Sequence, residues 1–113
     1  MDIKEHIKPF VIVDHENSTS LILNVGKYKS EIFLVRGDEG FEGNGYDWSS
    51  LAQVFLDEKM PELQDLINFD PEAGMFCAYS ESAEAIENFA TQFKAMCEDE
   101  DLMRDLFSRA ELD

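Results

Sequence analysis

The sequence has few of the residues that most often perform chemistry in small proteins. It contains two cysteines and two histidines among 113 residues. Cys77 and Cys97 are separated by nineteen residues and form neither a CxxC motif nor a Cys/His metal pattern. Each lies at an apolar position of a predicted element, so we expect buried free thiols. His6 and His15 both lie near the N-terminus, so the cysteines and histidines indicate neither a metal site nor a Cys–His nucleophile.

Long apolar runs, signal-like segments and nucleotide motifs are also missing. The first ten residues, MDIKEHIKPF, mix charged and apolar residues, unlike a secretory signal, and no apolar run reaches the length of a membrane span. There is no GxSxG motif. Gly43-Asn44-Gly45 has neither the GxGxxG spacing nor a following Lys-Ser/Thr pair. We therefore expect a cytoplasmic protein that is not an enzyme and has no catalytic residue, metal site, cofactor or membrane segment.

Basic residues are scarce. Nine Lys and Arg stand against 25 Asp and Glu, which gives a formal net charge of −16. Residues 1–36 are balanced, and residues 37–113 carry the whole excess. Such a charge repels nucleic acid and anionic membranes and attracts basic partners, although an acidic surface also keeps a protein soluble. The composition therefore predicts no nucleic-acid partner and no membrane partner, and it favours a basic protein partner.

The apolar residues are numerous enough for a folded core. Hydrophobic residues make up 44% of the chain and include nine Phe, one Trp and three Tyr. Three short apolar runs ended by turn residues predict the first strands of an antiparallel meander. In the second run, Leu21, Leu23 and Val25 alternate with Ser20, Ile22 and Asn24, which predicts one packed and one partly solvated sheet face. The three predicted strands are Phe10–Asp14, Leu21–Val25 and Ile32–Arg36.

A glycine-rich acidic loop, Gly37–Tyr46, precedes the first predicted helix. We expect Asp47 to be its N-cap, with Tyr46 and Leu51 forming a hydrophobic staple. Trp48, Leu51, Ala52 and Phe55 then form an apolar stripe at helical spacing. Pro61 either kinks this helix or begins a second helical segment.

The rest of the chain predicts one more strand and two helices. Asn68–Gly74 is typical of a turn and Met75–Tyr79 of a strand. Ser80 or Ser82 is expected to cap the next helix, and the acidic run 98–101 to begin the last. The predicted order is β-β-β-α-β-α-α. It indicates a single α+β domain over residues 1–113, with a mostly antiparallel sheet of about four strands and helices packed on one face.

Two segments carry a family resemblance. Gly40–Trp48 (GFEGNGYDW) leads into a stretch ending in FDPEAGMFCAYS, and FATQF and LMRDLFSRAEL follow near the C-terminus. Together they resemble the immunity protein 51 family of bacterial polymorphic-toxin systems. The resemblance implies a protein that binds and neutralises a toxin domain, for example a nuclease with a basic cleft. From the residues alone, GNGYDW is equally well interpreted as a turn, a cap and a core tryptophan.

The candidate binding residues are chosen from charge and expected exposure. They lie along the glycine-rich loop and on or near the polar side of the first helix: Asp38, Glu39, Glu42, Asp47, Asp57, Glu58, Glu62 and Asp65. Asp38, Glu42, Asn44 and Asp47 also offer oxygen ligands for calcium, but their spacing does not match the EF-hand loop.

Two other functions remain open at this point. One is a general acidic adaptor or nucleic-acid mimic, which binds many basic proteins. The other is a carboxylate-dependent hydrolase, which requires a pocket holding a carboxyl group of raised pKa.

Overall fold

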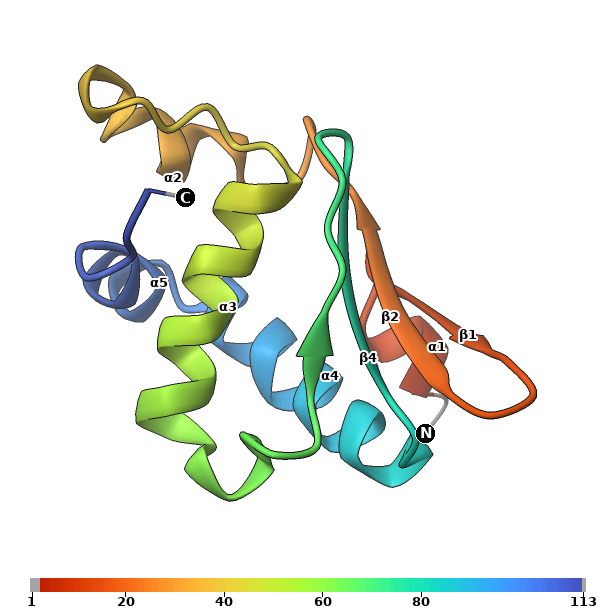
Figure 1. The fold of residues 1–113 in the computed structure, drawn as a ribbon. Helices are drawn as coiled ribbons and strands as arrows, with labels where there is room; N and C mark the ends of the chain where they lie inside the picture. The colour runs from red at the N-terminus through yellow and green to blue at the C-terminus, as the bar shows by residue number, and fades with distance from the viewer. Residues whose placement is uncertain (1–2, 113) are drawn as a thin grey trace.

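The computed structural model describes residues 3–112 as a four-stranded antiparallel sheet and a set of helices (Figure 1). The strands lie in the order β1-β2-β4-β3. Their bounds are Val11–Asp14 for β1, Thr19–Asn24 for β2, Asn68–Phe69 for β3 and Met75–Ser80 for β4. The helices are α1 (Ile3–His6), α2 (Ser30–Leu34), α3 (Gly45–Lys59), α4 (Ala83–Glu98) and α5 (Glu100–Phe107), with 3-10 turns η1 (Gly37–Glu39) and η2 (Pro61–Leu63).

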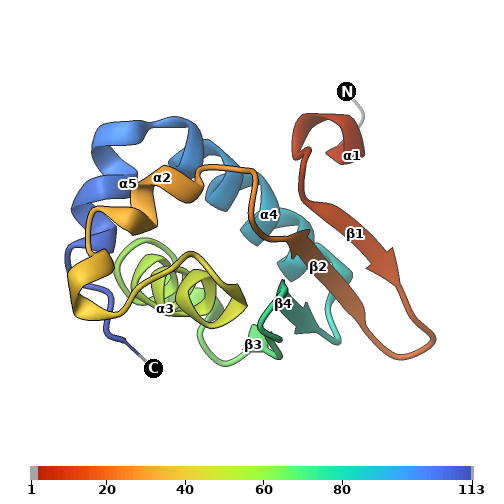
Figure 2. The same ribbon diagram turned by 90° about the horizontal axis from the view of Figure 1, so that it is seen from above.

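One face of the sheet forms the floor of the core. Leu21 pairs with Ala78 and Leu23 with Phe76 across β2 and β4, and all four side chains are buried. Helix α4 packs on β2 and β4, and α3 packs on β4. Figure 2 shows the helices gathered on this side of the sheet. The predicted α+β class, the antiparallel sheet and the one-sided helical layer are confirmed.

The predicted third strand, Ile32–Arg36, is wrong. Its first residues belong to helix α2 instead. Ile32 and Phe33 are both buried, and Leu34 and Val35 are both exposed, whereas a strand would alternate. Because every residue of IFLV is apolar, the run shows no period that could reveal the helix.

Strand β3 comes from a segment that was predicted to be a turn. Asn68 pairs with Tyr79 and Phe69 with Ala78, which places β3 along the edge of β4. The segment Asn68–Gly74 is otherwise a turn, as predicted, and the strand within it is only two residues long. Such a strand is too short to show alternation, so the sequence does not distinguish it from the turn that follows.

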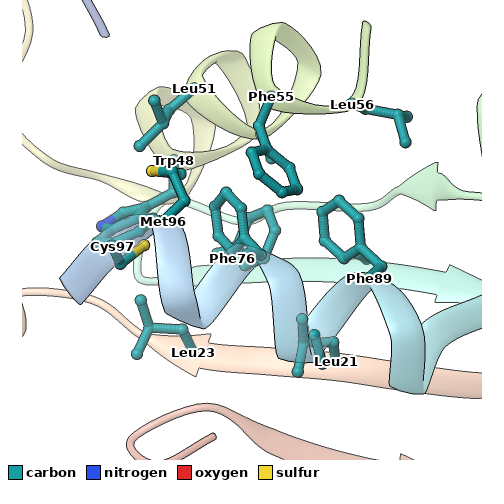
Figure 3. Close-up of a cluster of buried hydrophobic side chains, with 14 of the residues drawn as sticks. Leu21, Leu23, Trp48, Leu51, Phe55, Leu56, Phe76, Phe89, Met96 and Cys97 are labelled. Atoms are coloured by element: carbon teal, nitrogen blue, oxygen red, sulfur yellow. The ribbon is translucent and has the colours of Figure 1, made fainter. Parts of the chain in front are cut away.

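The core is rich in aromatic rings contributed by α3, α4 and the sheet (Figure 3). The ring of Trp48, which is fully buried, lies 6.2 Å from that of Phe93 and 6.4 Å from that of Phe76, between centroids. Phe55 contacts Phe93 edge-to-face at 5.3 Å. The helical stripe predicted for α3 is therefore the face that packs on the core.

Helix α3 begins three residues earlier than predicted. Its N-cap is Asn44, whose side-chain oxygen accepts the backbone N–H of Asp47 at 2.9 Å. Asp47 is the third helical residue and closes the other half of a capping box. The predicted N-cap at Asp47 is therefore wrong. Asn and Asp are both good cap formers, so residue type alone does not decide between Asn44 and Asp47. The predicted staple is wrong as well, because Tyr46 is 41% exposed.

The amino terminus of α3 lies directly against the turn between β3 and β4. The N–H of Gly45 donates to the carbonyl of Ala73 at 3.0 Å. A Cβ atom on Gly45 would lie 1.9 Å from the carbonyl oxygen of Glu72 and 2.2 Å from that of Met75. Only glycine allows this approach, so Gly45 fixes where α3 meets the sheet.

The remaining helix ends are capped by side chains close to the predicted positions. Ser82 caps α4 by accepting the N–H of Ala85 at 3.1 Å. Asp99 caps α5 by accepting the N–H of Leu102 at 3.3 Å, in agreement with a helix beginning within the acidic run. Helix α3 ends at Lys59, and Pro61 begins η2, which is the second of the two alternatives expected there.

Arg36 ties the end of α5 to the loop before α3. Its Nη1 atom donates to the carbonyls of Phe107 and Ala110, at 2.6 and 2.7 Å. Neither carbonyl accepts a hydrogen bond from within α5. The guanidinium also lies over the rings of Phe41 and Phe107, at 4.5 and 5.1 Å from their centroids. This contact holds the carboxyl end of the chain against the core.

Candidate partner-binding surface

The eight candidate acids follow the path of the chain from η1 to the segment after η2. Asp38 and Glu39 lie in η1, Glu42 lies in the loop that follows, and Asp47 lies in the first turn of α3. The other four are Asp57 and Glu58 near the end of α3, Glu62 in η2, and Asp65 just beyond it. All are exposed except Asp47.

Asp47 is not part of the exposed surface. It is 2% exposed, and its Oδ2 atom accepts the backbone N–H groups of Glu42 and Gly43 at 2.8 Å and that of Asn44 at 3.4 Å. Its carboxylate therefore organises the glycine-rich loop from within. A partner could reach this side chain only if the loop unfolded, so its assignment to the contact surface is corrected.

Two of the exposed candidates already have basic partners within the chain. Glu39 forms a two-pronged ion pair with Arg36, at 2.8 and 2.9 Å. Glu58 forms a similar pair with Arg109, at 2.7 and 2.8 Å. These hydrogen bonds hold the pKa of each carboxyl group below its usual value. Glu39 and Glu58 therefore contribute less to the outward field than their exposure suggests.

The other candidates point into solvent without an ion pair in the described part of the chain. Asp57 accepts hydrogen bonds from the amides of Gln53 and Gln64 at 2.9 and 2.8 Å. The structure does not bring the candidates together in one pocket. Asp57, Glu62 and Asp65 each line a different surface hollow, and Glu42 lines a fourth together with Asp47.

The basic residues are largely neutralised by nearby acids. Six of the nine form ion pairs within residues 3–112: Lys8, Lys29, Lys94, Arg36, Arg104 and Arg109. These pairs lie on the helices and the adjoining loops. The net negative charge of the protein is therefore carried mainly by acids elsewhere, whose charges are not offset locally.

Two of the four residues considered as calcium ligands already use their side-chain oxygens in the fold. Asp47 accepts backbone N–H groups, and the side-chain oxygen of Asn44 accepts the N–H of Asp47. Within residues 3–112, no group of three or more His, Cys, Asp and Glu side chains is arranged to hold a metal ion. The loop is thus a capping structure that the glycines make possible.

A carboxylate-dependent hydrolase requires a carboxyl group of raised pKa, and the carboxyl groups with displaced pKa values are not of this kind. Among the described residues these are Glu39, Glu58, Glu98 and Asp105, and each pKa is lowered. The main cause in every case is a hydrogen bond from a neighbouring side chain, Arg or Tyr. A general acid would instead need a raised pKa.

Both cysteines are free and buried, as expected. Burial raises the pKa of each thiol. Cys97 lies in the core on α4, and Cys77 lies on β4 on the face of the sheet opposite the helices. Neither has the lowered pKa typical of a reactive cysteine.

One surface feature was only half visible in the sequence. The alternation in β2 predicted a partly solvated sheet face, but it did not show that Tyr79 of β4 stands exposed on that face. The strand MFCAY consists of apolar and aromatic residues throughout, so its two faces look alike. The register with β2 is needed to assign them.

Comparison with known proteins finds a match to one family model. No curated protein and no solved structure matches the chain. No helix between residues 3 and 112 combines the length and apolar character needed to cross a membrane. The model of the family described as immunity protein 51 matches residues 10–112, nearly the whole chain. The chain therefore belongs to the immunity protein 51 family.

Proposed function

We propose that this protein acts in the cytoplasm as an immunity protein, which binds a cognate toxin domain and blocks its activity through an anionic surface. The observation that carries the proposal is the match of residues 10–112 to the immunity protein 51 family. In this interpretation the protein inhibits by occupying the toxin and performs no chemistry itself.

The charge distribution supports a basic partner. The net charge of −16 attracts a basic domain over long distances and speeds its association. A nuclease is one such domain, because its active cleft must attract phosphate groups. Five acids of the candidate set are exposed without an ion pair among residues 3–112 and are available to such a cleft: Asp38, Glu42, Asp57, Glu62 and Asp65.

The test is a binding experiment with protection as its second readout. The tagged protein is used to isolate its partner from its own organism at low and at high salt, and the purified partner domain is then titrated with the protein. We expect one stoichiometric partner that remains bound at high salt, because contacts buried at the centre of an interface are screened little. Co-expression should then restore growth to cells that make the partner domain.

A general acidic adaptor or nucleic-acid mimic gives a different result. It would bind many basic proteins, and these would be released as salt screens the surface charges. That outcome, or a stoichiometric partner whose toxicity is unchanged by the protein, would refute the proposed function.

A further inference from the structure

The side of the sheet opposite the helices is not covered by any element of residues 3–112 (Figure 2). The pairing register assigns its side chains to two rows across the strands. Val13, Ser20, Tyr79 and Asn68 form the first row. The second row contains Val11, Ile22 and Cys77. The N–H of Asp70 donates to the carbonyl of Cys77 at 2.9 Å, so Asp70 lies beside this row. We call this surface the open face.

The open face is apolar at its centre. Tyr79 is 38% exposed and Val11 is 53% exposed, and Val13 and Ile22 are partly exposed beside them. Cross-strand neighbours of this kind form a continuous surface rather than isolated side chains. Such a patch marks a protein contact more often than it marks ordinary surface.

The strands of the sheet and the turns that connect them contain acids but no lysine or arginine. The whole sheet and its connecting turns fall within residues 9–26 and 60–93, and neither segment contains a Lys or an Arg. The N–H of Asp70 donates to the carbonyl of Cys77 and Glu72 forms a bridge with Met75, so both acids lie along β4 at the edge of the face. The acids of these segments are Asp14, Glu16, Glu62, Asp65, Asp70, Glu72, Glu81, Glu84 and Glu87.

A hollow of about 580 Å³ lies at one end of the open face. Exposed Leu66 and Tyr79 contribute apolar walls, and Asp65 and Glu81 contribute carboxylates. The amino terminus of α4 adds a partial positive charge here, but Glu81 and Glu84 next to it leave this end net negative. The hollow thus has an apolar wall for an aliphatic stem, an aromatic ring and two negative charges, which together suit a Lys or Arg side chain.

From these features we infer that the open face is the surface that binds the toxin, with Tyr79 at its centre and a toxin Lys or Arg side chain in the hollow between Tyr79 and Leu66. The inference rests on the proposed function and locates its contact surface. A second copy of this chain is a poor occupant, because it would bring the acids of two sheets together. A basic partner with an apolar patch complements both the apolar centre and these acids.

The test compares matched variants in titrations with the purified toxin domain. Tyr79→Ala removes the centre of the open face, and Tyr46→Ala removes a tyrosine of similar exposure, 41%, beside the acidic loop before α3. We expect Tyr79→Ala to raise Kd by about 30-fold or more, as the loss of a central aromatic residue does, and Tyr46→Ala to change it by less than about threefold. Asp70→Lys should slow association by about tenfold, and Asp101→Lys at the exposed start of α5 should slow it much less.

Circular dichroism and urea unfolding establish that each variant is folded before binding is measured. The inference is overturned if Tyr79→Ala leaves Kd unchanged, or if the control variants Tyr46→Ala and Asp101→Lys weaken binding as much as Tyr79→Ala and Asp70→Lys do. It is also overturned if the protein alone sediments as a dimer that Tyr79→Ala dissociates, because a second copy then occupies the face. A wild-type protein that fails to bind the toxin domain refutes the proposed function itself, and the inference with it.

Discussion

Replacing Gly45 by alanine tests how α3 is attached to the sheet. Helix propensity alone predicts that this change stabilises the protein, because alanine is better than glycine in a helix by about 1 kcal/mol. The structure predicts the opposite sign. The new Cβ would lie 1.9 Å from the carbonyl oxygen of Glu72, which must retreat by about 1.5 Å to reach an ordinary contact. That movement also strains the hydrogen bond from Gly45 to Ala73, 3.0 Å long in the native protein.

The expected magnitude follows from these opposing contributions. Overpacking against a backbone that has no flexible side chain to move costs about 3 kcal/mol or more, and the weakened hydrogen bond costs about 1 kcal/mol. The gain in propensity offsets about 1 kcal/mol. We therefore expect Gly45→Ala to lower the free energy of unfolding by about 3 kcal/mol and the Tm by about 10 °C.

The assay is urea unfolding followed by the fluorescence of Trp48, the only tryptophan, which is fully buried in the native state. Gly37→Ala is the matched control, because a Cβ at Gly37 meets no atom within 4 Å. The control should be neutral or stabilising by up to about 1 kcal/mol. If Gly45→Ala stabilises the protein as much as the control does, α3 does not approach the turn as closely as described, and the reasoning is refuted.

Three further changes probe the contacts that hold the loops and helix ends. Asp47→Ala leaves up to three backbone N–H groups without an acceptor and should lower the free energy of unfolding by about 2–4 kcal/mol in urea titrations, whereas Asp57→Ala should change it by less than about 0.5 kcal/mol. Arg36→Met keeps the apolar stem but removes the donor of the Ala110 carbonyl and one of the two donors of the Phe107 carbonyl, which still accepts the N–H of Ala110, and it should cost about 2 kcal/mol in the same measurement. Tyr28→Phe removes the hydrogen bond to Glu98 at a cost of about 1 kcal/mol near pH 7. Burial and this hydrogen bond raise the pKa of Tyr28 above its ordinary value of 10.0, so the stabilisation by Tyr28 is lost as the pH rises above 10. The difference in unfolding free energy between wild type and Tyr28→Phe should therefore narrow above that pH. A constant difference up to pH 11 contradicts this assignment.

The accuracy of the sequence-based predictions depended on whether a segment showed a period. The helix around Trp48 carries apolar residues every three to four positions, so its core face was assigned correctly. The run Ile32–Arg36 has no polar residue before its end, and only the fold decides that it forms a helical turn. The strand Asn68–Phe69 is ordered by pairing with β4 rather than by its own residues.

The candidate surface shows a related limit. A count of charged residues predicted an anionic protein, and such a count requires no knowledge of the fold. Which acids act outward depends on contacts between distant residues, as when Arg109 reaches across 51 positions to Glu58. Asp47 was misplaced although its partners are close in sequence, because the N–H groups of Glu42 and Gly43 reach its carboxylate only along the path that the loop takes in the folded chain.

The distinctive motif GNGYDW marks the scaffold rather than the toxin contact. Asn44 and Asp47 cap α3, Gly45 permits the approach to the β3–β4 turn, and Trp48 fills the core, so only Tyr46 remains exposed. A partner therefore has little access to the residues on which the family resemblance depends. If the protein binds a toxin as we propose, discrimination between toxins falls to exposed side chains, and the open face offers Tyr79 and Val11. If this reasoning is right, exchanging open-face residues should change which toxin is bound while the unfolding free energy stays nearly constant.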